Sequence, residues 1–133
     1  MKLHFLPDDS GAAPLIRLFD FDTSEAQLLQ DALTKIADQE VESLAIHELP
    51  FISVLNGIEL TAMFDDRLRN PDNDFAILGG ATTSSFIWRG TLEEWQQHVD
   101  VLQPFTEHCD VNSYAWLTDD LGVQLLVSSS GSW

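Results

Sequence analysis

The sequence predicts an α+β domain in which two helices pack on a largely antiparallel sheet. Two segments carry apolar residues at helical spacing behind a capping motif, and the other apolar runs are short and bounded by turn residues. Most of these short runs are neighbours joined by short loops, which favours antiparallel pairing. With 133 residues, 44% of them hydrophobic, the chain can bury one core. We therefore expect a single domain over residues 1–128 and a flexible tail over residues 129–133.

The N-terminal third is expected to form a strand, a loop, a second strand and the first helix. Leu3–Phe5 is a short strand candidate, and residues 7–14 form a loop by composition. Leu15–Phe21 is apolar on both alternating faces apart from two charged residues, which is typical of a buried strand. The first helix begins near Asp22–Ser24, where polar side chains can cap its free N–H groups. Its apolar stripe consists of Ala26, Leu29, Leu33, Ile36 and Ala37.

The middle of the chain is expected to form a β-hairpin. Leu44–Leu49 and Phe51–Leu55 have the composition of strands and are separated by Pro50, and Ile58–Phe64 is a further strand. The intervening Asn56-Gly57 favours a type I′ turn, because both residues tolerate positive φ. This turn would pair the two flanking strands and align their apolar side chains on one buried face.

Four further strands are expected in the second half of the chain. The polar segment Asp65–Asp74 forms a loop. Phe75–Leu78 and Ser85–Arg89 are predicted to pair with each other, and Tyr114–Thr118 is predicted to pair with Val123–Ser128 across a turn.

The second helix has the clearest capping signal. Thr91 and Glu94 have the spacing of a capping box, and Pro104 is expected to end the helix. Strand and helix positions place Trp88 and Trp116, as well as Trp95, in or near the core. The buried stripe of this helix is predicted to comprise Leu92, Trp95, Val99 and Leu102.

The charge of the chain limits its partners. Six Lys and Arg stand against 22 Asp and Glu, which gives a net charge of −16. A field this negative repels phosphate backbones and anionic lipids, so no direct nucleic-acid or membrane partner is expected. Cys109 is the single cysteine, and the N-terminus lacks the apolar run of a signal peptide. Both observations favour a reducing, cytoplasmic location.

One short motif suggests chemistry. Asp20-Phe21-Asp22-Thr23 lies where a buried strand meets a helix. Over these four residues the chain resembles the nucleophile motif of the haloacid-dehalogenase-like phosphatases. The resemblance implies a hydrolase that uses carboxylates and a divalent ion. The residues also allow a structural interpretation, in which Asp22 caps the helix and Asp20 is its solvated neighbour.

Two other groups contain side chains that can bind metals. His108-Cys109-Asp110 has neither zinc-finger spacing nor a second histidine at helical spacing. Oxygen ligands gather in one loop, at Asp65, Asp66, Asp72, Asn73 and Asp74. Their spacing does not match a calcium-binding loop, so a solvated turn is the better interpretation. We therefore expect no cofactor, no metal and no catalytic residues.

The interpretation that these observations favour is a non-enzymatic protein-binding module. Opposite potentials steer association, so the expected partner is a basic protein, as for an inhibitor, an immunity-type protein or a mimic of nucleic-acid charge. The candidate interaction surface consists of Asp65, Asp66, Asp72, Asp74, Asp119, Asp120 and Trp133.

Alternative interpretations remain open from the sequence. The order helix, three strands, helix, two strands resembles the secretion chaperones of type III systems, which implies a homodimer that holds extended client segments. The metal-dependent hydrolase is a second alternative. The acidic surface could also serve only to keep the protein hydrated in a salty cytoplasm.

Overall fold

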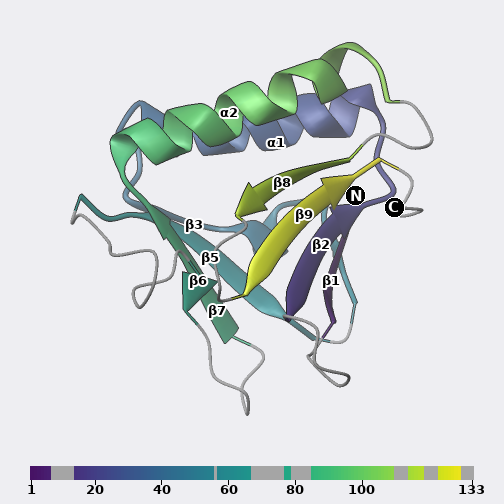
Figure 1. The fold of residues 1–133 in the computed structure, drawn as a ribbon, viewed down its shortest axis with the longest axis horizontal. Coiled ribbons are helices and arrows are strands. Elements are labelled where there is room, and N and C mark those ends of the chain that lie inside the picture. The colour runs from purple at the N-terminus through teal and green to yellow at the C-terminus, as the bar shows by residue number, and fades with distance from the viewer. Residues whose placement is uncertain are drawn as a thin grey trace.

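The described part of the chain folds into two α-helices, a short 3₁₀ helix (Ile46–Glu48) and two β-sheets, which confirms the predicted α+β class (Figure 1). A computed structural model describes residues 1–6, 14–55, 57–66, 77–78, 85–109, 114–118 and 123–129. Within these ranges the two helices lie across one side of the molecule and the two sheets lie beneath them, inclined to each other. The tail predicted at 129–133 falls outside the described residues except for Ser129, whose carbonyl accepts a hydrogen bond from the Phe21 N–H at 3.1 Å.

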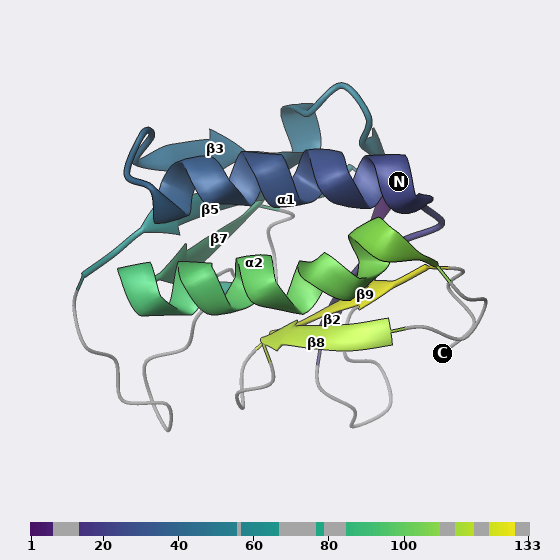
Figure 2. The ribbon, with the colours of Figure 1, turned by 90° about the horizontal axis from the view of Figure 1, so that it is seen from above.

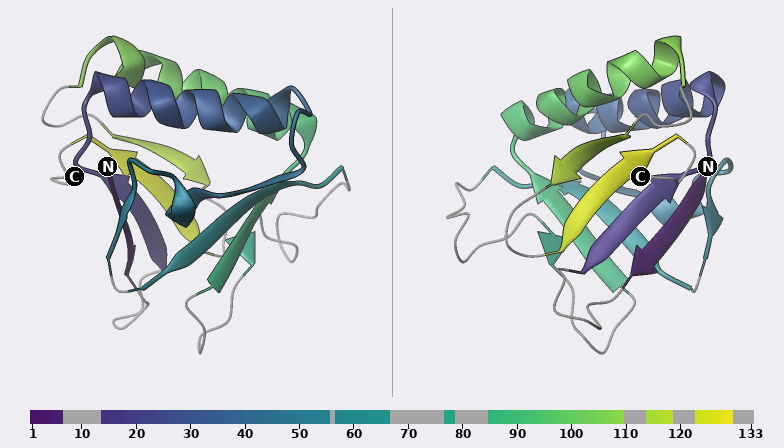
Figure 3. Two further views of the ribbon diagram at one scale, coloured as in Figure 1. Left: turned by 180° about the vertical axis from the view of Figure 1, so that it is seen from behind. Right: turned by 45° about the vertical axis from the view of Figure 1, so that its right-hand side comes forward.

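One sheet has five strands in the order β4-β1-β2-β9-β8 (Figure 3). Its antiparallel pairs are β1 with β2 and β8 with β9, and its parallel pairs are β1 with β4 and β2 with β9. The strands are β1 (Lys2–Leu6), β2 (Leu15–Phe19), β4 (Ser53–Val54), β8 (Tyr114–Thr118) and β9 (Gln124–Ser128). The predicted pairing of the last two strands is confirmed.

The other sheet has four strands in the order β3-β5-β7-β6. Its strands are β3 (Ser43–Ala45), β5 (Glu59–Phe64), β6 (Ile77–Leu78) and β7 (Ser85–Gly90). The pairs β3–β5 and β6–β7 are antiparallel, and β5–β7 is parallel. Both sheets are therefore mixed, where a largely antiparallel sheet was expected. The parallel pairs join strands that are not consecutive in the chain, and loop length alone gives no sign of such pairs.

The predicted hairpin around Asn56-Gly57 is wrong. β4 lies beside β1 in the five-stranded sheet, where the Leu55 N–H donates to the Leu3 carbonyl at 2.8 Å, whereas β5 belongs to the four-stranded sheet. Asn56 is outside the described residues, and Gly57 has the left-handed φ of +68° that the turn signal predicts. The turn thus carries the chain from one sheet to the other, so its two flanking strands do not pair.

Both helix N-termini follow the prediction. Asp22 caps α1 (Thr23–Ala37) by accepting a hydrogen bond from the Glu25 N–H at 2.9 Å. Thr91 caps α2 (Leu92–Glu107), and the reciprocal bonds of its capping box with Glu94 are both present, at 3.0 and 3.3 Å.

The C-terminus of α2 differs from the prediction. Pro104 lies inside the helix, which continues to Glu107. Proline has no N–H, so one backbone hydrogen bond of the helix is missing at Pro104. Because Pro104 stands in the last turn, few hydrogen bonds of the helix are affected. Its carbonyl still accepts a bond from the His108 N–H at 3.1 Å.

The helices lie side by side and antiparallel (Figure 2). Gln30, which is buried in α1, ties them together: its side-chain amide donates to the Val99 carbonyl at 3.0 Å and to the Gln103 Oε1 at 2.9 Å. The buried stripe of α2 is rotated from the predicted one and consists of Trp95, His98, Leu102 and Phe105. Leu92, predicted to be buried, is 37% exposed.

The hydrophobic core lies between the sheets and beneath the helices. The sheets contribute Leu3, Ile16, Leu18, Leu125 and Val127 on one side and Leu60, Ala62, Phe86 and Trp88 on the other. The helices contribute Leu29, Leu33, Ile36, Trp95 and Leu102. Trp88 and Trp95 are fully buried, as predicted. Trp116 is 40% exposed, because its position opposite Leu126 puts it on the outer face of the five-stranded sheet.

The same outer face carries a histidine beside an arginine. The Arg17 guanidinium lies 4.2 Å from the centre of the Phe19 ring, and its Nη2 is 3.4 Å from the His4 Nδ1. Burial lowers the pKa of His4, and the positive charge of Arg17 lowers it further. His4 is therefore held neutral where an exposed histidine would begin to gain a proton.

This pKa shift predicts a loss of stability in mild acid. Below about pH 6.5 the unfolded chain binds a proton at His4 that the folded protein resists, so the free energy of unfolding falls as the pH falls. His4→Gln should remove this contribution. Urea unfolding of both proteins at about pH 7.5 and about pH 5.5 checks it, and we expect wild type to lose more stability than the variant. A difference between the two proteins that does not change with pH would contradict the prediction.

Candidate interaction surface

Four segments meet at one edge of the molecule, namely the turn after α1, the end of β5, the end of β7 and the start of α2. This edge lies near the left-hand end of the helices in Figure 1. The turn after α1 reaches β5 through a hydrogen bond from the Phe64 N–H to the Glu42 carbonyl at 2.8 Å. The Asp65 N–H then donates to the Gly90 carbonyl at 2.9 Å, just before α2 begins. These bonds hold the turn after α1, the end of β5 and the start of α2 together.

This edge is strongly anionic. Among the residues that the structure describes, the basic residues of this edge are Lys35, in the last turn of α1, and Arg89. The described acidic residues there are Asp38, Glu40, Glu42, Asp65, Asp66, Glu93 and Glu94. Five of these acids are exposed, and we call them the acidic edge: Asp38, Glu40, Glu42, Asp66 and Glu93.

The structure brings together two of the predicted interaction residues. Asp66 is exposed and belongs to the acidic edge. Asp65 is next to it, but its carboxylate forms an ion pair with Arg89 at 3.8 Å, and the two side chains are only 12% and 7% exposed. Asp65 thus neutralises a buried guanidinium. The other predicted residues lie outside the described residues, namely Asp72, Asp74, Asp119, Asp120 and Trp133.

The acids that follow α1 were not among the predicted interaction residues. Asp38, Glu40 and Glu42 alternate along a segment of five residues, and this local density of charge is the signal that could have identified them. Glu42 lies beside the end of β5, just before Asp66, because β3 pairs with β5 and Ser43 lies opposite Met63.

A shallow, open pocket of about 220 Å³ lies within the acidic edge. The described residues that line it are Gln39, Val41, Glu42 and Phe64. Pockets for small molecules and cofactors usually measure about 300–1,000 Å³ and enclose most of the ligand. This one therefore has the size of a receptor for one side chain of a partner. The Glu42 carboxylate has no hydrogen bond or ion pair with any residue that the structure describes.

The backbone at the pocket has an unusual conformation. Gln39 follows the C-cap of α1 with a left-handed φ of +61°. Its N–H donates to the Ile36 carbonyl at 3.0 Å, and the Glu40 N–H donates to the Lys35 carbonyl at 2.8 Å, which closes the helix. Glycine is the usual residue at this position, because a side chain is strained in the left-handed region.

Gln39→Gly should therefore stabilise the fold. The relief of strain exceeds the extra flexibility of the unfolded chain, and we expect a gain of about 0.5–1 kcal/mol in the free energy of unfolding. Gln39→Ala is the control, because it removes the amide and keeps the strained conformation. Thermal and urea unfolding of both variants check the prediction, which is wrong if alanine stabilises as much as glycine does.

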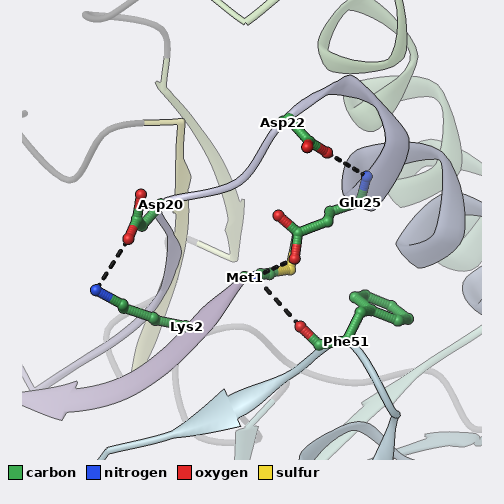
Figure 4. A network of polar contacts seen from close by, with 6 residues as sticks. All are labelled: Met1, Lys2, Asp20, Asp22, Glu25 and Phe51. Carbon is green, nitrogen blue, oxygen red and sulfur yellow. Dashed lines mark hydrogen bonds and ion pairs between the residues drawn. The ribbon is translucent and has the colours of Figure 1, made fainter.

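The segment with the phosphatase-like motif has structural roles (Figure 4). As predicted, Asp22 caps α1. The exposed Asp20 forms an ion pair with the Lys2 Nζ at 2.9 Å, and this hydrogen bond and the charge of Lys2 lower the pKa of its carboxyl. Glu25 binds the α-amino group of Met1, which also donates to the Phe51 carbonyl at 3.2 Å.

In the described part of the chain, no three His, Cys, Asp or Glu side chains are grouped so that they could hold a metal ion. No helix there is long and apolar enough to cross a bilayer. Comparison of the chain with known protein families, curated proteins and solved structures found no match. The acidic edge is therefore the feature of the molecule that suggests a function.

Proposed function

We propose that the protein is a non-enzymatic binding module that receives a basic protein segment at the acidic edge. The observation that supports this most is the pocket, because it is lined by Phe64 and by Glu42, whose carboxylate is unengaged, and lies among exposed acids. Aromatic and charged groups around a small depression are typical of the points where an interface anchors a partner side chain.

The charge of the whole chain supports the same proposal. A net charge of −16 attracts a basic protein from a distance and raises the rate of encounter. The acidic edge then provides the surface at which the partner binds. The same field opposes direct binding of nucleic acid or anionic membranes. Together with the single cysteine, this makes the cytoplasm the proposed location.

The proposal is tested with a probe whose charge is known, a short oligolysine peptide that contains arginine. We compare wild type with an edge variant in which the five acids of the acidic edge become amides. The matched control converts five exposed acids elsewhere to amides, namely Asp31, Glu48, Glu59, Asp100 and Glu107. Both variants have the same net charge, so the field at long range is the same.

We expect the edge variant to bind the peptide at least about tenfold more weakly than the control variant does, as measured by calorimetry at low and moderate salt. Binding should weaken as salt increases in wild type. Equal affinities of the two variants would mean that the net charge alone attracts the peptide, and would contradict the proposal. The homodimer and the metal-dependent hydrolase stay predictions, which light scattering and a metal titration can test.

A further inference from the structure

We propose that the pocket in the acidic edge is a receptor for a single arginine side chain of the basic partner, an inference that rests on the proposed function. The described residues that line it are Phe64, Glu42, Gln39 and Val41. Their side chains comprise an aromatic ring, two kinds of oxygen acceptor and an apolar group. Few side chains complement all of these groups.

The guanidinium of arginine has the matching chemistry. It is planar and always charged, stacks on aromatic rings and presents its N–H donors as a rigid fork. A carboxylate such as that of Glu42 can accept two of these donors at once, and an amide oxygen such as that of Gln39 can accept another. The aliphatic stem of arginine would then lie along Val41. Each wall of the pocket has a counterpart in one side chain.

Lysine matches the same walls less well. Its ammonium is a compact, strongly hydrated point charge that does not stack as a plane and does not pair with both oxygens of a carboxylate. It would gain the attraction of the surrounding acids but little from the ring. The pocket is therefore expected to distinguish arginine from lysine, whereas the acidic edge around it attracts both.

The pocket is held in place before a partner arrives. One wall is tied to the next by the hydrogen bond from the Phe64 N–H to the Glu42 carbonyl at 2.8 Å. The Val41 N–H is bonded to the Lys35 carbonyl at 3.3 Å, which fixes the turn to the end of α1. A site that is already ordered loses little conformational entropy on binding.

The side chain at position 39 is consistent with this use. The φ of +61° favours glycine, so a glutamine there costs stability, and a role of its amide in binding would account for its presence. In the proposed complex this role is to accept a hydrogen bond from the guanidinium. The substitution that should stabilise the free protein, Gln39→Gly, is then expected to weaken binding of arginine.

The experiment titrates the full chain with three oligolysine peptides that differ only at the central residue, which is arginine, lysine or citrulline. Citrulline has nearly the shape of arginine without its charge. We expect the arginine peptide to bind about tenfold more tightly than the other two. In wild type, amide resonances of residues 39–42 and of Phe64 should shift most strongly with the arginine peptide.

Glu42→Gln should abolish the preference for arginine. Glu93→Gln is the matched control, because Glu93 is an exposed acid of the acidic edge that does not line the pocket. It should weaken all three peptides only slightly and keep the preference. Phe64→Leu is a second pocket variant, but Phe64 is partly buried, so Glu42→Gln, which changes an exposed residue, decides the result.

The outcomes separate this inference from the proposed function. Salt-dependent binding with equal affinity for arginine and lysine, or equal effects of Glu42→Gln and Glu93→Gln, would overturn the arginine receptor and leave the acidic binding module in place. No salt-dependent binding of any peptide would overturn both.

Discussion

Trp95→Phe is expected to lower the free energy of unfolding by about 3 kcal/mol, and Trp88→Phe by only about 1 kcal/mol. The two indoles are both fully buried and their rings are 4.7 Å apart, so each substitution removes a similar amount of core. Their N–H groups differ. The Trp95 Nε1 donates to the Met63 carbonyl at 3.2 Å, whereas the Trp88 Nε1 is buried with no acceptor among the described residues.

The difference follows from what each substitution leaves behind. Phenylalanine at 95 removes a donor and leaves the part-buried Met63 carbonyl without it, which adds to the cost of the lost packing. Phenylalanine at 88 removes a polar group that has no partner, and this offsets part of the same packing cost. Trp95 is therefore the more important of two residues that look equivalent by burial.

Urea unfolding followed by far-ultraviolet circular dichroism measures both effects, since each variant loses a fluorophore. Equal slopes of the free energy of unfolding against urea concentration would show that both variants expose the same surface area when they unfold. The prediction is contradicted if the two substitutions cost the same, or if Trp88→Phe costs more. That result would mean that the Trp88 N–H has a partner in solution.

Local signals in the sequence predicted most elements, although a 3₁₀ helix over Ile46–Glu48 replaces most of the strand expected over Leu44–Leu49. Asp22 and Thr91 cap the two helices as expected, because a capping bond involves residues within one turn. Pairing between distant strands was not predictable in this way. Asn56-Gly57 is a genuine turn signal, but the partner of the strand before it is β1, at the start of the chain. A local pattern gives no information about a contact between residues so far apart.

The stripe of α2 shows a second limit. Its apolar residues predicted a face that includes Leu92 and Val99, yet the helix buries His98 against Trp88, with ring centres 5.0 Å apart. A histidine can pack as an aromatic ring once the neighbours that stack on it are known. Hydrophobic periodicity treats histidine as a polar residue, so the predicted buried face of α2 is rotated relative to the observed one.

The candidate site could be predicted only in part, because it also depends on contacts between residues that are distant in the chain. A surplus of acid suggested the basic partner that we propose, and it pointed to Asp65 and to one residue of the acidic edge, Asp66. It could not show that Arg89, which is far along the chain, neutralises Asp65. Nor could it place Glu42 beside Phe64, because that contact depends on the order of strands in the four-stranded sheet.

Glu25→Gln is expected to lower the free energy of unfolding by about 1–3 kcal/mol, the second largest effect that we predict. Glu25 neutralises the α-ammonium of Met1 at a point where the first strand, the first turn of α1 and the segment before β4 meet (Figure 4). The Met1 side chain is fully buried, and the Glu25 side chain is 27% exposed. Glutamine keeps the shape and one oxygen acceptor but not the charge.

The cost arises because one partner of a shielded pair remains charged. With glutamine at 25, the ammonium keeps the Phe51 carbonyl at 3.2 Å as an acceptor and loses its counter-charge. A fully buried pair would cost about 3–5 kcal/mol to break, and the partial exposure of Glu25 reduces this value. Water reaches one side of the site and replaces part of the lost interaction.

Glu93→Gln is the matched control for this substitution. Like Glu25, Glu93 is an acid in the first turn of a helix, but it is exposed and forms no ion pair with a described residue. It should cost only about 0.3–1 kcal/mol, the value of an acid near a helix N-terminus. Chemical acetylation of the α-amine gives a further check: it removes the positive charge, so Glu25→Gln should cost less in the acetylated protein than in the free one. If Glu25→Gln and Glu93→Gln are equally stable, Glu25 stabilises the protein only through its interaction with the helix dipole. The buried ammonium then needs no carboxylate to hold the start of β1 against α1.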